Sequence, residues 1–183
     1  ISIAEEKGKK FSEENAQVLI DIVGENRSML EDQLEKICVF LNKEKEISIE
    51  SIQQVSSELK QFNIFDLQNA LGLKDKSKSL TVAYNLLDNG AEPTFIITML
   101  TRYFTGLAKI TELKTINIPV QEAARIVGTH HFYYPNYVKA RTLYSDEKLV
   151  EVFRSLLKAD ISVKTTSSDD KTIITLLIAE ILQ

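Results

Sequence analysis

Residues 93–110 read PTFIITMLTRYFTGLAKI, and this stretch decides the fold. Apolar residues recur along it every three or four positions, the spacing that places side chains on one face of an α-helix. Pro93 suits the first helical position, because its ring fixes φ near the helical value and the N–H that it lacks has no helical partner there. The pattern predicts a central helix of about five turns, buried along Ile96, Met99, Leu100, Tyr103, Phe104, Leu107 and Ile110.

The composition of the whole chain favours the same fold class. Its 183 residues include only 6 Gly and 3 Pro, whereas a β-sandwich needs a turn signal about every ten residues. A content of 44% hydrophobic and 26% charged residues is that of an ordinary folded domain, which excludes a disordered chain. We therefore predict an all-α protein.

The helices expected around the central one divide into two modules, over residues 1–62 and 63–183. Residues 1–63 carry a net charge of −5 and residues 64–183 carry +1, which add to the −4 of the chain. Neither module therefore has the basic surface of a protein that wraps DNA.

Because the chain begins at Ile1 rather than at Met, we expect it to be the middle of a longer protein. No apolar run is long enough to cross a bilayer, so we expect no membrane contact.

Serines mark several expected helix starts, because their hydroxyl groups accept hydrogen bonds from unpaired backbone N–H groups. Ser12, Ser48 and Ser145 are the predicted N-caps. The long helix that follows Ser145 is expected to direct these residues inward: Leu149, Phe153, Leu156 and Leu157. The segment from Lys74 to Lys78 is predicted to be a loop.

Two features of the sequence contain residue types that can form chemical sites. His130 and His131 are adjacent, and no cysteine or carboxylate lies at metal-ligand spacing from them, which favours loop packing over a metal site. Cys38, the one cysteine, lies on an apolar helix face and is expected in the core. A single cysteine excludes an internal disulfide and indicates a reducing compartment, here the cytoplasm. We predict no catalytic residue, no cofactor and no metal.

A third feature is a run of tyrosines that alternates with basic residues. Such a pattern can stack on and pair with single-stranded nucleic acid, but its nearly neutral surroundings favour packing of the rings between two short helices. The residues are Tyr133, Tyr134, Tyr137, Lys139, Arg141 and Tyr144.

Six segments follow one another in an order and spacing that match a known family. They are Leu34–Ile37 (LEKI), Ile47–Glu50 (ISIE), Glu58–Leu67 with Ala70–Leu71 (ELKQFNIFDL and AL), Leu86–Pro93 (LLDNGAEP), Phe132–Ala140 (FYYPNYVKA) and Leu157–Lys164 (LKADISVK). Together they resemble the delta subunit of bacterial DNA polymerase III, a clamp-loader subunit, over nearly the whole chain. The fifth segment departs from the family pattern, since residues are inserted and Pro135 follows the aromatic residues instead of preceding them.

The resemblance implies both an architecture and a role. Members of the family have an AAA+ ATPase-like domain, a small helical lid domain and a helical collar domain. This chain would hold the lid, residues 1–62, and the collar, residues 63–183. The family's delta subunit does not hydrolyse ATP; its first domain opens the sliding clamp, and its collar joins those of tau/gamma and delta-prime in a ring. The implied role is in DNA replication, as a subunit of the polymerase holoenzyme, with DNA contacted indirectly or weakly.

Two sets of residues are candidates for this role. Apolar side chains beyond the needs of one core would be buried against neighbouring subunits, and the predicted interface anchors are Phe95, Tyr103, Phe104 and Phe153. The connection between the modules is a predicted hinge, formed by Gln61, Phe62, Asn63 and Ile64.

Two other classes of protein are alternatives to this interpretation. The alternative function is a helical dimerisation or ligand-binding domain of a transcription regulator, a class that needs a helix-turn-helix with basic recognition residues. The acidic first module lacks one. A small helical enzyme would need polar residues that converge on inward faces, whereas the predicted inward faces here are almost wholly apolar.

Overall fold

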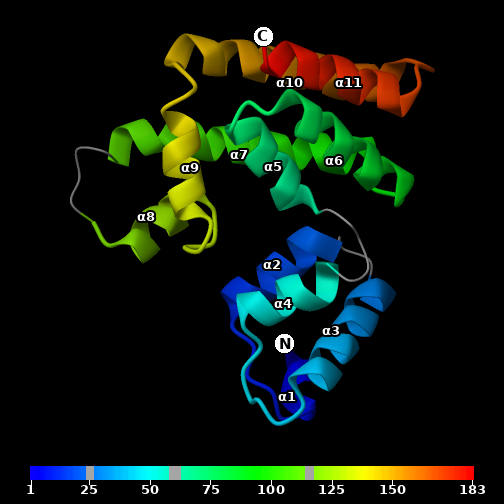
Figure 1. Cartoon of the computed structure of the whole chain (residues 1–183), viewed down its shortest axis with the longest axis vertical. Helices are drawn as coiled ribbons and strands as arrows, with labels where there is room; N and C mark the ends of the chain where they lie inside the picture. Colours follow the sequence, from blue (N-terminus) through cyan, green and yellow to red (C-terminus); the bar gives the residue numbers. More distant parts are fainter. Residues whose placement is uncertain (24–26, 58–62, 114–117) are drawn as a thin grey trace. The chain divides into compact units, whose positions relative to one another are not determined.

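The predicted central helix forms α7 (Pro93–Leu113) in the computed structural model, where it passes through the middle of its unit (Figure 1). Pro93 is its first residue, and every residue of the expected inward face is buried. Burial of so many large side chains stabilises the fold, since each contributes about 1.5 to 3 kcal/mol relative to exposure. The sequence prediction for this helix is therefore confirmed.

The structure describes residues 1–23, 27–57, 63–113 and 118–183. Within these ranges the regular elements are eleven helices, and the β-type pairing is limited to one isolated bridge between Lys10 and Glu46. The all-α prediction is confirmed. The described residues separate into two compact units, 1–63 and 64–183.

The first unit contains α1 (Ser2–Glu6), α2 (Glu13–Val23), α3 (Arg27–Leu41) and α4 (Ile49–Ser57). The Ser12 and Ser48 hydroxyl groups accept hydrogen bonds from the first-turn N–H groups of Asn15 and Ser51, at 3.2 and 3.3 Å. Both N-caps are as predicted. The core of the unit is made by fully buried aliphatic side chains, among them Ile37, Ile47 and Ile52.

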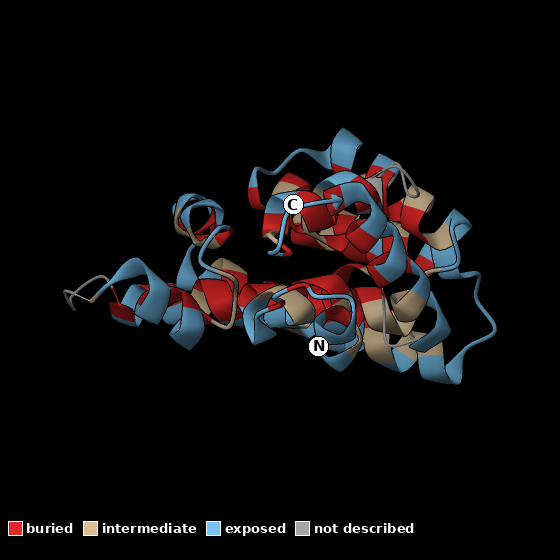
Figure 2. Ribbon diagram, turned by 90° about the horizontal axis from the view of Figure 1, so that it is seen from below, coloured by how far each residue is buried: buried red, intermediate tan, exposed pale blue. Residues whose placement is uncertain are grey.

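The second unit contains α5 (Ile64–Gly72), α6 (Lys76–Asp88), α7, α8 (Val120–Val127), α9 (Tyr134–Arg141), α10 (Asp146–Thr165) and α11 (Asp170–Ile181). Helix α7 packs against α10 along one side and against α5, α8 and α9 elsewhere. Helix α11 packs against α10 and α6. Figure 2 shows the resulting pattern, with buried residues along the inner faces of the helices and exposed residues outside.

The expected loop from Lys74 to Lys78 is shorter than predicted. Helix α6 begins at Lys76, because the carboxylate of Asp75 accepts a hydrogen bond from the Lys78 N–H at 2.9 Å and caps the helix. Three closely spaced lysines concealed this start in the sequence, since the capping residue lies between two of them.

Ser145 caps α10, and its contribution can be measured. Its hydroxyl oxygen accepts a hydrogen bond from the Lys148 N–H at 3.2 Å. We expect Ser145→Ala to lower the free energy of unfolding by about 1 kcal/mol, because the N–H loses its acceptor. Urea denaturation followed by circular dichroism measures the change. Ser145→Asp, which keeps an acceptor at the same place, should retain the stability of the wild type, and equal losses in both variants would contradict the capping role.

Candidate functional site

The four predicted interface anchors do not share one environment. Tyr103 and Phe104 are 2% and 0% exposed, inside the core of the second unit, where a partner could reach them only after local unfolding. Phe95 and Phe153 are half-buried and retain some accessible surface. Tyr103 and Phe104 therefore fill the core of their own unit, and of the predicted anchors only Phe95 and Phe153 can contribute to a surface.

The predicted hinge lies partly outside the described residues. Gln61 and Phe62 fall there, Asn63 is half-buried, and Ile64 begins α5 with its side chain almost fully buried. The second unit thus begins at a firmly packed residue.

Helix α10 has two apolar faces. Its inner face is buried at Leu149, Val152, Leu156 and Ala159. Its outer face carries the α10 stripe, which consists of Val150, Leu157 and Ile161, each at least half exposed. The expectation that Leu157 points inward is wrong, since it is 61% exposed. The reason is geometric: Leu157 lies seven residues after Val150 and shares its face, about 100° around the helix from Leu156.

An open groove of about 650 Å³, here called the α7–α10 groove, runs beside this stripe. Its apolar lining includes Ile97 from α7 and Phe153, Leu156 and Leu157 from α10. Exposed apolar surface of this kind marks interaction sites on proteins. Sequence periodicity did not reveal the groove, because it is formed by helices that are far apart in the sequence.

Two basic residues of α7 line the same groove. The Arg102 guanidinium donates a hydrogen bond to the Gly128 carbonyl at 3.2 Å, and the Lys109 ammonium donates one to the Ile126 carbonyl at 3.1 Å. Both acceptors lie at the C-terminal end of α8, where the helix dipole favours cations. These hydrogen bonds orient the two side chains, both of which are exposed where they line the groove.

The tyrosine run packs between helices, as the sequence analysis favoured. Tyr133, Tyr137 and Tyr144 are buried. The Tyr144 hydroxyl donates to the Leu71 carbonyl at 2.6 Å, and the Tyr137 ring meets Tyr103 edge-on with centroids 4.7 Å apart. Burial raises the pKa of the Tyr103 and Tyr144 phenols far above the ordinary value. Both phenols therefore stay neutral at physiological pH, and their rings pack in the core.

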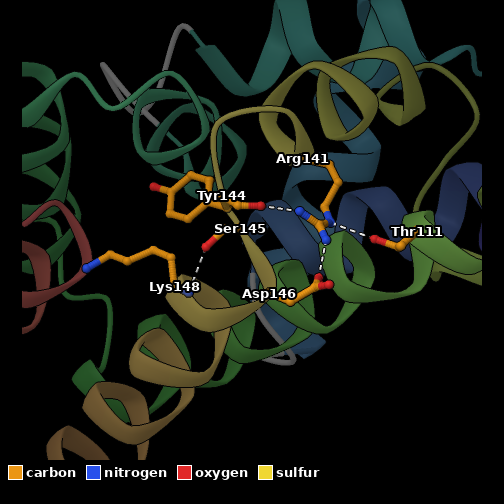
Figure 3. Close-up of polar contacts among 6 residues, drawn as sticks. All are labelled: Thr111, Arg141, Tyr144, Ser145, Asp146 and Lys148. Carbon is orange, nitrogen blue, oxygen red and sulfur yellow. Dashed lines mark hydrogen bonds and ion pairs between the residues drawn. The ribbon is translucent and has the colours of Figure 1, made fainter.

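Arg141, the basic residue at the end of the run, is buried and joins three parts of the second unit (Figure 3). Its Nε donates to the Thr111 hydroxyl of α7 at 2.9 Å. Its two terminal nitrogens donate to the Tyr144 carbonyl and to the Asp146 carboxylate. A guanidinium can make all three contacts because its donors form a rigid planar fork. This cluster fixes the connection between α9 and α10, and thereby the start of α10.

The remaining candidates for a chemical site are His130, His131 and Cys38, and their contacts are those of ordinary packing. His130 Nδ1 accepts a hydrogen bond from the Phe132 N–H at 3.1 Å, and its ring lies 4.2 Å from that of His131. Cys38 is buried as expected, and desolvation raises the pKa of its thiol, which disfavours the reactive thiolate form.

A comparison with known families gives a match over the second unit. The family model described as "DNA polymerase III delta subunit, C-terminal domain" matches residues 61–181. The chain belongs to the DNA polymerase III delta subunit family. This membership supports the delta-subunit interpretation over the transcription-regulator alternative.

Individual relatives of this delta-family chain agree with the assignment. The DNA polymerase III subunit delta of Bacillus subtilis is 22% identical over 183 residues, which cover 100% of this chain and 53% of the relative. The probable DNA polymerase III subunit delta of Aquifex aeolicus is 25% identical over 160 residues, 85% of this chain and 45% of the relative. The chain therefore spans about half the length of these relatives.

A solved structure shows the same fold. The alignment with the Bacillus subtilis DNA clamp loader delta protein (YqeN) covers 100% of this chain and 54% of that protein, with a TM-score of 0.60 and 21% identity.

No helix in the described ranges of the delta-family chain is long and apolar enough to span a membrane.

The delta-family motifs lie mostly at helix ends. Leu86–Pro93 ends α6 and begins α7, and Asn63–Leu67 leads into α5. The displaced Pro135 lies in the first turn of α9, where a proline removes no hydrogen bond of the helix. The departure from the family pattern at this segment is therefore compatible with the helix.

Proposed function

We propose that this chain is the assembly part of a delta subunit of the DNA polymerase III clamp loader. It has residues 1–62 as a lid-like domain and residues 63–183 as a collar domain. Its role is to join the other loader subunits, tau/gamma and delta-prime, so that the sliding clamp is opened and loaded on primed DNA. In this proposal the chain has no catalytic site of its own and acts in the cytoplasm.

The observation that carries the proposal is the second apolar face of α10. A helix that had only to complete its own core would expose a polar outer face, whereas Val150, Leu157 and Ile161 present aliphatic side chains to solvent. Such a face is expected where a unit is incomplete without a neighbour. Family membership and the fold shared with a clamp loader delta protein supply the kind of neighbour.

The linker residues have a place in this proposal. The two compact units divide between Asn63 and Ile64, so residues 61–64 would pass motion of the lid to the collar. The buried side chain of Ile64 would anchor the collar end of that linker.

Reconstitution tests the proposed function. We expect the full-length subunit, mixed with tau/gamma and delta-prime, to elute as one hetero-oligomer in size-exclusion chromatography with light scattering. We also expect the mixture to load its sliding clamp on primed DNA in the presence of ATP. Omission of this subunit is the control and should abolish loading. The proposal would be refuted if the subunit stayed monomeric with both partners present and clamp loading were the same without it.

A further inference from the structure

The α7–α10 groove combines an apolar lining with basic edges. Arg102 and Lys109 are seven residues apart on α7, so their Cα atoms are separated by two helical turns, about 10 Å along the axis. Arg154 is not part of the groove lining but lies on α10 next to the α10 stripe, four residues after Val150 and three before Leu157, and is exposed. Cations therefore flank the apolar surface on both of its helices.

The acidic residue of the groove does not balance these charges. Asp160 lines it, but its carboxylate is paired with Lys164 on the same helix, at 2.7 Å. Lys109 donates to a neutral carbonyl and has no ion pair within the described part of the chain. Arg154 likewise forms no ion pair with any residue that the structure describes. Lys109 in the groove and Arg154 beside the α10 stripe therefore leave an excess of positive charge along this apolar surface.

We propose that the α7–α10 groove binds one amphipathic helix of a partner subunit, and that this helix carries carboxylates along both edges of its apolar stripe. The inference rests on the proposed function and names the chemistry of the partner. Aliphatic residues of the partner helix lie against Phe153, Leu157 and Ile161. Its Asp or Glu side chains lie against Lys109 and Arg102 on one edge and Arg154 on the other.

The walls of the groove explain why the partner segment is a helix. Both α7 and α10 satisfy their backbone groups internally, and the Thr101 hydroxyl, which faces the groove, donates to the Ile97 carbonyl at 2.8 Å. An extended segment in the groove would therefore find few backbone partners for its own N–H and C=O groups. A helix brings its backbone already paired and offers only side chains.

Charge and shape have separate effects, so two kinds of variant test the inference. The charge variant is Lys109→Glu with Arg154→Glu, and the apolar variant is Leu157→Glu, with Leu157→Ala as a milder second change. All three positions are exposed, so the fold should persist, as circular dichroism would check. The matched controls lie outside the groove: Lys76→Glu on α6 and Leu176→Glu on α11, both at exposed positions.

The measurement is the Kd of the full-length subunit for the other purified loader subunits, between 50 and 500 mM salt. We expect the charge variant to bind at least about tenfold more weakly at low salt. The difference from wild type should shrink at high salt, where exposed charges are screened. Leu157→Glu should weaken binding at every salt concentration, Leu157→Ala should do so to a lesser extent, and both controls should bind as the wild type does.

A photo-crosslinking residue at position 157 identifies the occupant. In the assembled loader we expect it to capture a partner segment that is helical, with acidic residues beside an apolar stripe. Capture of a second copy of this chain, or of DNA, would overturn the inference. So would unchanged Kd values in the groove variants while the wild type assembles. If the wild type itself fails to assemble, the proposed function fails first, so the two failures are distinguishable.

Discussion

We expect Gly72→Ala to lower the free energy of unfolding of the second unit by about 2 to 3 kcal/mol, the upper part of the range for overpacked cores. Gly72 ends α5 and is buried. A Cβ at this position would overlap the Tyr103 hydroxyl of α7 and lie 2.9 Å from the Cβ of Ala140 on α9. Alanine favours a helix over glycine by about 1 kcal/mol, but the overlap outweighs this gain. Urea denaturation of the wild type and the variant measures the difference.

A second substitution tests the cause of that loss. Tyr103→Phe removes the hydroxyl group that the new Cβ would meet, so the double variant should recover part of the stability lost by Gly72→Ala. Full recovery is not expected, because the contact with Ala140 remains. Gly90→Ala is the control, since a Cβ there meets no atom within 4 Å but φ is +81°. Its cost should be about 1 to 2 kcal/mol, and Tyr103→Phe should leave it unchanged.

A close approach such as that of Gly72 to Tyr103 cannot be predicted from the sequence. Helix α7, which carries Tyr103, was predictable. The residues of α7 have a periodicity that specifies a buried face, and Pro93 specifies where the helix begins, so both followed from local rules. The N-caps Ser12, Ser48 and Ser145 were predictable for the same reason. That Gly72 must be small depends on where α7 and α9 lie, which is a property of the packed unit.

The sequence indicated what kind of site to expect, an assembly surface, but not which residues form it. The abundance of apolar positions indicated an assembly module, but the sequence does not tell which apolar face is outward, and large rings such as Tyr103 and Phe104 also fill cores most effectively. Helix α10 shows the same ambiguity. Apolar residues occupy both its inner face and its outer stripe, and a sequence pattern cannot tell which of two adjacent leucines, Leu156 or Leu157, is covered by the rest of the unit.

We expect Arg141→Met to lower the free energy of unfolding by about 2 to 4 kcal/mol, the sum of an unsatisfied buried acceptor and two lost hydrogen bonds. Methionine retains much of the apolar volume but none of the hydrogen bonds to Thr111, Tyr144 and Asp146. The Tyr144 carbonyl then loses this donor inside the protein, and an unsatisfied buried acceptor costs about 1 to 3 kcal/mol. The loss of the other two contacts, at less buried partners, adds the remainder. Thermal and urea unfolding of the chain measure the change.

The ion pair itself should contribute little to that loss. The Asp146 side chain is 73% exposed, and pairs with an exposed partner are typically worth less than about 1 kcal/mol. Asp146→Asn, which removes the charge and keeps an acceptor, should therefore cost less than about 1 kcal/mol. Arg141→Lys should be intermediate, because an ammonium cannot reach three divergent acceptors as a planar fork does. If Asp146→Asn were as damaging as Arg141→Met, the charge and not the buried carbonyl would hold the start of α10 in place.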